Sequence, residues 1–491
     1  MAGRIRSHFK DLCLGLALTL ALALTLEALI RARGHAPPAP DLSRGFDADA
    51  SYLIPDPQHA GGFRTQFFDG KLPERQIPPR DERTRVLLMG GSNTAGLSAV
   101  TLQRLLNANG SQYEVINLGR AGYGSARVAI LVDQALELLD PDLLIIYSGH
   151  NEFVERSFRM DLGGVWRDAL VELAHRSALI RYVAESLEPE RAPGSGRRPE
   201  AWEMEYKKFK GLQYDGTLKV IAQYRENLRS ICQAADDHGV RVLLCTVIHN
   251  LYSAPFESTL PADLRPSEVQ SFEEHHVAAR SRLPGFLAAL LPRDEMQRVH
   301  GPDWSTGSPR SDAPDAQHGR RPGLGELAGR PSGHPPVEGW NEKVWAVWDA
   351  LDQFHKGPTG EDQTASLEIA ERELRAALEV CPDHPLALFE LGLVQQLLGR
   401  DPVLFAGSLK LAARYDRAPR RGNDATNDVV RALASEFQHT RLLDADGVFA
   451  RRVPHGLMGW EWMADHCHIV GGAKAVLLGD MARAVEGWFG R

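Results

Sequence analysis

The chain of 491 residues is long enough for two or three domains that each bury a hydrophobic core. Its 56 Lys and Arg are outnumbered by 64 Asp and Glu, which gives a formal net charge of -8. Proteins that bind nucleic acid usually carry a clustered basic surplus, so we expect no nucleic-acid partner. The five cysteines show no CxxC spacing and indicate neither a zinc site nor a disulfide framework, and we expect no metal or cofactor.

The N-terminal segment, residues 1–34, is predicted to be a membrane anchor or an export signal. Residues 12–30 are apolar except for threonines and one glutamate, and basic residues precede them. As a helix, this segment would span the ~30 Å hydrocarbon core of a bilayer. A cleaved signal peptide is the alternative, because "ALA" at residues 21–23 resembles a cleavage site. Either way, we expect the rest of the chain outside the cytoplasm, in the periplasm or at the cell surface.

Residues 35–83 are rich in proline and turn residues, which predicts a spacer. Beyond this spacer, four short runs dense in Val, Ile and Leu predict strands: "RVLLMG", "YEVINLG", "DLLIIYSG" and "RVLLCTVIHN". Amphipathic stretches of helical length separate the first three runs. Continuous apolar strands that alternate with helices are typical of a parallel sheet covered on both faces. The sequence therefore predicts an α/β fold, a three-layer α/β/α sandwich with a parallel sheet.

The second half of the chain predicts an insertion into this fold. Residues 291–340 are dominated by Gly, Pro, Ser and charge, and we expect a disordered linker. In residues 341–415, small and large apolar residues recur as in tetratricopeptide-like helical repeats of about 34 residues. About one and a half repeats are too few to stand alone, so we expect them to pack against the α/β domain; a protein partner at these helices is the alternative. The α/β pattern resumes in residues 416–491 with a strand and a closing helix.

Chemically active residues follow the predicted strands. Ser92 comes directly after the first strand, where a strand enters a helix and ligands bind; alone, it would simply cap that helix. In "NLGRAGYGS", Gly122 allows close backbone approach, and in "YSGHNEF" Asn151 lies just past the third strand. Near the C-terminus, "MADHCH" contains Asp465 and His468. A serine, a backbone donor, an amide donor and an Asp-His pair are the parts that acyl transfer needs.

This set of residues resembles the SGNH, or GDSL-type, family of serine hydrolases. The resemblance covers residues 84–290 and 416–491, the two parts of one hydrolase domain. It implies that Ser92 in "GGSNT" is the nucleophile, and that Asp465 and His468 are the "DxxH" pair. An oxyanion hole is implied as well, with the backbone of Ser92 and Gly122 and the side chain of Asn151 as its donors. The chain also looks like a subgroup with an N-terminal membrane segment and inserted tetratricopeptide-like helices.

The sequence departs from the family pattern at two positions beside the predicted site. Gly91 stands where the family has Asp before the serine, and Glu152 stands where Asp usually follows the asparagine. Neither position carries the proton transfer, so we expect activity to survive. His466 is a rival for the role of base, because it adjoins Asp465, but the "DxxH" spacing favours His468.

From these features the sequence predicts a membrane-anchored serine esterase that acts outside the cytoplasm through an acyl-serine intermediate. Its expected substrate is a small-molecule or glycan ester, such as an O-acetyl group on a cell-envelope glycan or a lipid ester. One alternative is an O-acyltransferase that uses the same residues on an envelope polysaccharide. The other is a non-catalytic tethered scaffold that binds a protein through the tetratricopeptide-like helices.

Overall fold

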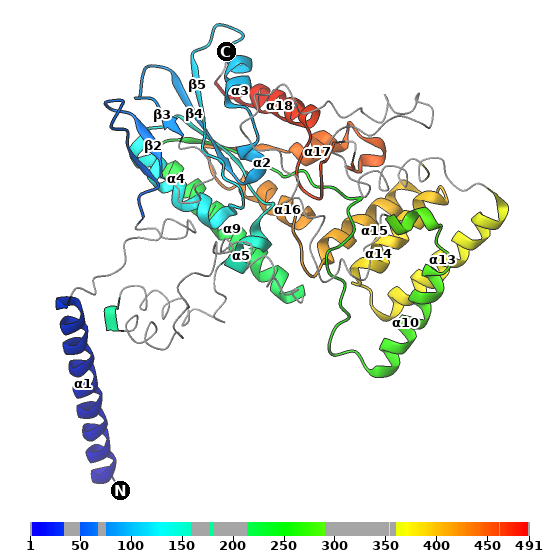
Figure 1. Ribbon diagram of the computed structural model, residues 1–491, viewed down its shortest axis with the longest axis horizontal. Helices are drawn as coiled ribbons and strands as arrows, with labels where there is room; N and C mark the ends of the chain where they lie inside the picture. The colour runs from blue at the N-terminus through cyan, green and yellow to red at the C-terminus, as the bar shows by residue number, and fades with distance from the viewer. Residues whose placement is uncertain are drawn as a thin grey trace, which may run out of the picture.

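A computed structural model describes residues 2–33, 50–66, 75–158, 177–179, 214–289, 353, 360–460 and 462–489. The linker expected over residues 291–340 lies outside these ranges. A parallel sheet of five strands forms the centre of the fold (Figure 1). In chain order its strands are β4 (Thr84–Gly90), β5 (Tyr113–Asn117), β6 (Leu143–Tyr147), β7 (Arg241–Cys245) and β8 (Thr440–Leu443).

The strands lie in the order β5-β4-β6-β7-β8, and every neighbouring pair is parallel. This confirms the predicted parallel-sheet α/β fold. The chain places β5 on one side of β4 and continues with β6 on the other side. Loops that leave the carboxyl ends of β4, β5 and β6 therefore diverge at this point of reversal, which is where ligands bind in open α/β sheets.

Helices cover both faces of the sheet, as the continuous apolar strands predicted. One face packs against α4 (Ser125–Leu139), α9 (Tyr214–Asp237) and α16 (Asp424–Leu433). The other face packs against α3 (Ala99–Leu106), α17 (Ala445–Ala450) and α18 (Gly471–Phe489). Alternate residues of β4 supply the two cores, because successive side chains of a strand point to opposite faces: Leu87 and Met89 face α4, whereas Val86 and Leu88 face α18.

The predicted spacer over residues 35–83 is wrong for its second part. There β1 (Leu53–Pro55), β2 (Phe63–Thr65) and β3 (Gln76–Ile77) form a small antiparallel sheet. Tyr52 and Ile77 are buried in the core that includes α4, and Gln134 of α4 bonds the backbone of Tyr52 and Ala50. Prolines at the strand ends and in the turns, where they cost no ladder hydrogen bond, account for the spacer-like composition.

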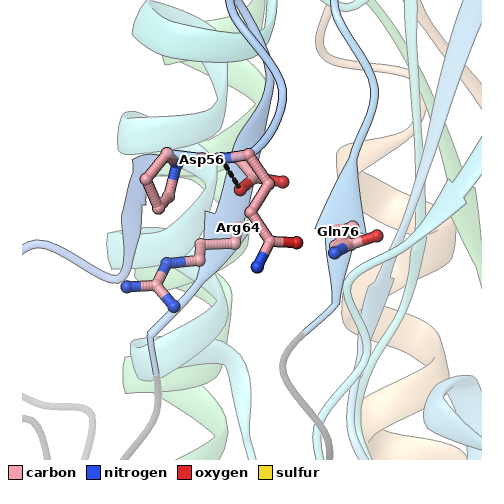
Figure 2. A pocket seen from close by; sticks show the side chains of 5 residues that line it. Asp56, Arg64 and Gln76 are labelled. Carbon is pink, nitrogen blue, oxygen red and sulfur yellow. Dashed lines mark hydrogen bonds between the residues drawn. The ribbon is translucent and has the colours of Figure 1, made fainter.

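A polar cavity of about 220 Å³ lies at this small sheet (Figure 2). Its lining residues are Asp56, Pro57, Gln58, Arg64 and Gln76. In Figure 2 the labelled side chains come from β2, β3 and the turn after β1. None of the predicted active-site residues lines this cavity.

A helical unit lies between β7 and β8 in the sequence, and Figure 1 shows it to one side of the sheet. Its helices are α10 (Pro266–Arg280), α13 (Glu361–Val380), α14 (Pro385–Leu397) and α15 (Pro402–Tyr415). The boundary differs from the prediction, because α10 was assigned to the hydrolase part over 84–290 but shares its core with α13 and α14. Its apolar face is covered by these helices and not by the sheet. The likeness to tetratricopeptide repeats stays a prediction.

The N-terminal residues form helix α1 (Ala2–Ala32). Glu27 on this helix accepts hydrogen bonds from Ser177 Oγ and from the backbone N–H groups of Ala178 and Leu179. Among the described residues, no helix combines the length and the apolar character needed to cross a membrane. The transmembrane helix expected over residues 12–30 is therefore not confirmed.

A buried ion pair joins the first two strands to the small sheet. Arg85 on β4 is 1% exposed, and its Nε lies 2.7 Å from Oε2 of Glu114 on β5. The other nitrogens of its guanidinium donate to the carbonyl oxygens of Leu139, Pro78 and Pro79. One side chain thus connects β4, β5, the end of α4 and the chain after β3.

We predict that Glu114→Gln lowers the free energy of unfolding by about 3 kcal/mol, because Arg85 would keep a buried charge without a carboxylate partner. Urea denaturation of the full chain measures this loss. The control is Glu226→Gln, because Glu226 is 61% exposed and pairs with Arg229 at the surface. This pair is worth at most about 1 kcal/mol. If both variants lose the same free energy of unfolding, the carbonyl oxygens around Arg85 are sufficient to compensate its buried charge without Glu114.

Candidate active site

The nucleophile turn connects β4 to the short helix α2 (Ser92–Ala95) at the carboxyl edge of the sheet. Gly90 has φ of +154°, and a Cβ there would lie 2.2 Å from the carbonyl oxygen of Tyr147 on β6. Only glycine fits this close approach of the two chains. The turn therefore places Ser92 at the reversal point of the sheet, beside the loop that follows β6.

A chain of hydrogen bonds connects three predicted residues. Ser92 Oγ lies 2.8 Å from His468 Nε2, across 376 positions of the sequence. His468 Nδ1 lies 2.7 Å from Oδ2 of Asp465, which as a carboxylate can only accept this bond. Nε2 of a neutral imidazole is then free to take the serine proton. The structure thus brings the serine, the base and the acid together in the order that acyl transfer requires.

The "DxxH" spacing has a local structural reason. The second oxygen of Asp465, Oδ1, accepts the backbone N–H of Cys467 at 2.8 Å and that of His468 at 2.7 Å. The aspartate therefore closes a tight turn on itself and presents its other oxygen to the imidazole. A longer or shorter spacing would break this arrangement.

Burial and charge set the protonation states of this pair. Burial lowers the pKa of His468, but the hydrogen bond to Asp465 and its charge outweigh burial, so that the pKa is raised above that of free histidine. Burial raises the pKa of Asp465, and the neighbouring His466 and His468 more than reverse this, leaving the carboxyl ionised. Burial lowers the pKa of His466 to about 4, so His466 stays neutral. Its ring packs against Phe256, with 4.8 Å between centroids.

One of the predicted oxyanion donors, the Asn151 side chain, lies against the residue before Ser92. The Asn151 side chain donates through Nδ2 to the carbonyl oxygen of Tyr123 at 2.9 Å. A Cβ placed on Gly91 would lie 2.4 Å from the same Nδ2, so the amide rests directly against the residue before Ser92. An amide nitrogen carries two hydrogens, and the second remains for a substrate. Within the described ranges, the backbone N–H groups of Ser92 and Gly122 donate to no other protein atom.

Buried charges that the sequence analysis did not single out hold the loop of Gly122. Arg127 donates through Nη2 to the Gly122 carbonyl oxygen, and its Nε lies 2.7 Å from Oε1 of Glu155. Glu155 also accepts the backbone N–H of Gly124 at 3.0 Å. The sequence contained one indication of this role for Glu155. Glu155 lies on α5 (Glu152–Phe158) and follows Asn151 by one helical turn. Each of these three loop residues is therefore bound by a different side chain. Arg127 binds Gly122, Asn151 binds residue 123, and Glu155 binds Gly124.

Glu152, a departure from the family pattern, serves the same loop. Its carboxyl group accepts the backbone N–H of Ser125 at 3.1 Å and the Ser125 hydroxyl at 2.5 Å. Burial, reinforced by the charge of Glu155, raises the pKa of Glu152 to about 8. Glu152 therefore binds the first residue of α4.

In the described part of the chain, one group of side chains has the spacing of a metal site. It consists of Asp465, His466 and Cys467, whose ligand atoms lie within 4.8 Å of one another. Burial raises the pKa of Cys467 well above its usual value, which opposes the thiolate that a metal requires. The Asp465 carboxylate is occupied by His468 and two backbone N–H groups. These residues fit the serine site better than a metal.

Comparisons with known proteins yield solved structures at low similarity. No protein-family model and no curated protein matches the sequence. The chain is similar to a GDSL-like lipase from Bacteroides thetaiotaomicron at 16% identity, covering 35% of this chain and 53% of that chain with a TM-score of 0.19. It is similar to the psychrotrophic esterase EstA from Pseudoalteromonas sp. at 14% identity, covering 33% and 60%, with a TM-score of 0.18.

A third similar structure is an acetyl xylan esterase, at 16% identity, with 36% of this chain and 66% of that chain covered and a TM-score of 0.19. The chain thus spans between about half and two thirds of these structures' own lengths. At TM-scores this low, the likeness adds nothing to what the geometry of the site indicates.

We predict that kcat/KM for p-nitrophenyl acetate rises with pH through a midpoint above the ~6.5 of free histidine. Protonated His468 cannot accept the serine proton, and its raised pKa keeps it protonated to higher pH. In Asp465→Asn, burial lowers the pKa of His468 without an opposing carboxylate, so the pH midpoint falls. The value of kcat/KM drops by about 10,000-fold. A midpoint below that of free histidine in the wild type would contradict this assignment.

We predict that Gly91→Ala lowers kcat by about 100-fold, because the added methyl group would displace the Asn151 amide from the oxyanion position. Steady-state kinetics measure this, with Tm as the check on folding. Gly407→Ala is the matched control, since a Cβ there meets nothing within 4 Å. Unchanged kcat in Gly91→Ala would show that Asn151 does not stabilise the oxyanion.

Proposed function

We propose that this protein is a serine hydrolase of the SGNH type that cleaves an ester through an acyl-serine intermediate. The observation that carries the proposal is the hydrogen-bond chain from Ser92 Oγ through His468 to Asp465, with distances of 2.8 and 2.7 Å. A serine hydroxyl that only caps a helix has no need of an imidazole oriented by an ionised carboxylate. The N–H groups of Ser92 and Gly122 and the Asn151 amide would supply the donors that acyl transfer requires.

In the first step, Ser92 Oγ attacks the ester carbonyl carbon and its proton passes to His468 Nε2. The electron pair of the carbonyl moves to its oxygen, which the N–H groups of Ser92 and Gly122 and the Asn151 amide bind. Asp465 stabilises the imidazolium that forms. When the tetrahedral intermediate collapses, the bond to the alcohol oxygen breaks, and the alcohol leaves with the proton from His468.

In the second step, His468 takes a proton from water, whose oxygen attacks the acyl carbon. The acid is released when the Ser92 ester bond breaks and Oγ recovers its proton. If another hydroxyl compound replaces water, the same residues perform acyl transfer. The acceptor in this step separates a hydrolase from the O-acyltransferase alternative.

We also propose that the hydrolase domain acts outside the cytoplasm on an acyl ester, such as an O-acetyl group on an envelope glycan or a lipid ester. The support is the order of features at the N-terminus: basic residues at positions 4, 6 and 10, then the apolar residues 12–30. This order is typical of export signals. Fractionation of cells that express the full chain tests it, and a cytoplasmic catalytic domain would reject it.

We predict that Ser92→Ala abolishes both turnover of p-nitrophenyl acetate and labelling by a fluorophosphonate, with a rate loss of at least about 10,000-fold. Ser98→Ala is the matched control. Ser98 caps α3 by accepting the Thr101 N–H, so its loss costs about 1 kcal/mol of stability but no activity.

Three outcomes separate the functions. Loss of turnover and labelling in Ser92→Ala alone supports the hydrolase. A wild type that is labelled but moves acetyl groups to a glycan faster than to water is an O-acyltransferase. A folded wild type that is neither labelled nor active rejects the serine mechanism and favours the scaffold.

A further inference from the structure

Asn93, the residue after the nucleophile, reaches across to the loop that carries the base. This side chain is 3% exposed. Its Nδ2 donates to the carbonyl oxygen of Cys467 at 2.8 Å, and its Oδ1 accepts the N–H of Ile469 at 3.2 Å. These two backbone groups flank His468 on either side. The amide therefore binds the backbone immediately before and after the base.

Asn250 binds the same loop from the other direction. It follows β7 and is completely buried. Its backbone N–H donates to the carbonyl oxygen of His466, and its side-chain Nδ2 donates to that of Asp465, both at 3.1 Å. Its Oδ1 accepts the N–H of Tyr252 at 3.0 Å. Arg421, buried as well, donates to the Asn250 carbonyl oxygen at 2.5 Å.

The two asparagines account for much of the backbone bonding of residues 465–469, which we call the base loop. Three of its carbonyl groups and one N–H group bind Asn93 or Asn250. A fourth carbonyl of the loop, that of His468, accepts the N–H of Ala464 at 2.6 Å. Among the described residues, an isolated bridge between Met463 and Ile469 is the only regular pairing of the base loop. Its shape therefore depends on side chains from distant segments.

We propose that Asn93 and Asn250 are positioning residues that fix the base loop so that His468 stays within hydrogen-bond distance of Ser92. This inference rests on the proposed serine hydrolase function. Asn93 and Ser92 lie on the same short helix, so the Asn93 bonds and the Ser92–His468 bond connect the same two segments in parallel. Neither asparagine touches a reacting atom, and each acts through His468 and Asp465.

An uncharged amide suits this role, because it offers a donor and an acceptor in one group. A carboxylate at position 93 would still accept the Ile469 N–H but would face the Cys467 carbonyl oxygen without a proton to donate. An alanine would lose both bonds and leave two backbone groups of the base loop unpaired. Asn93→Asp and Asn93→Ala thus remove one and two of the bonds, respectively.

The test compares Asn93→Ala, Asn93→Asp and Asn250→Ala with a matched control, Asn427→Ala. Asn427 is also completely buried and makes the same kind of bonds, donating to the Val247 carbonyl oxygen at 2.9 Å and accepting its N–H at 2.8 Å. The losses of stability should therefore be similar in Asn93→Ala and Asn427→Ala. Only the variants at the base loop should change the chemistry.

We expect kcat to fall by about 100-fold in Asn93→Ala with KM unchanged, because a base misplaced by about 1 Å costs this much. Asn93→Asp should lose less, and Asn427→Ala should keep the wild-type kcat. The pH midpoint of kcat/KM should fall in Asn93→Ala and Asn250→Ala, because a looser loop weakens the Asp465 contact that raises the pKa of His468. A purely structural role would leave this midpoint in place.

Other titratable groups near His468 do not confuse this readout. His466 and Cys467 lie on the base loop itself, Lys474 on α18, and His150 in the loop after β6. Asn93→Ala and Asn250→Ala leave all of these groups in place and add no titratable group. A shift of the midpoint therefore reports on the contact between His468 and Asp465.

A second measurement needs no substrate. The proton that His468 shares with Asp465 gives a far-downfield NMR signal, which should persist in Asn427→Ala and weaken in Asn93→Asp, the variant least disturbed in shape. If the wild type lacks turnover but these signals behave as expected, the proposed hydrolase fails and the positioning role stands. The positioning role would be overturned if the Asn93 and Asn250 variants had the same kinetics, pH midpoints and NMR signals as Asn427→Ala.

Discussion

The hydrogen bond between Ser92 and His468 is the interaction on which the arrangement of the site depends. It joins the end of the first strand of the main sheet to a loop near the end of the chain, 376 residues later. A bond of this kind contributes little stability by itself, about 1 kcal/mol. Its geometry must therefore be imposed by the sheet and by the bonds around it. The parallel order of the strands brings their carboxyl ends to one edge, where the loops after β4, β5 and β6 meet.

Charge at this edge is confined to places where each carboxylate has several donors. Asp465 binds His468 and two backbone N–H groups, and Glu155 binds Arg127 and the N–H groups at the start of α4. Where a bond must bridge two loops without adding charge, the chain uses asparagine. Asn151, Asn93 and Asn250 each link two segments in this way. An additional carboxylate in these positions would change the pKa of His468.

The helical insertion interrupts the sheet in sequence without disturbing it in space, because it leaves after β7 and returns before β8, two neighbouring strands. Residues 250–258 connect it to the site. Within this segment, Tyr252 donates to Gln396 of α14, and the backbone N–H of Phe256 donates to Asp416 at the end of α15. Since Asn250 begins the same segment and binds the base loop, the helices and the catalytic residues share one support.

The sequence by itself determined the strands, the helices on both sides and the local turn of Asp465 and His468, because these depend on patterns within a few residues. Apolar runs record burial, and the two bonds from Cys467 and His468 to Asp465 span at most three positions. Only the tertiary structure decided the contacts between segments that are far apart in the sequence. These are the pairing of β1 to β3 inside a proline-rich stretch, the packing of α10 on the inserted helices, and the bonds of Asn93 and Asn250 to the base loop. A periodic pattern shows that a residue is buried but carries no information on its partner, and a single asparagine in a sequence looks the same whether it faces solvent or a backbone several hundred residues away.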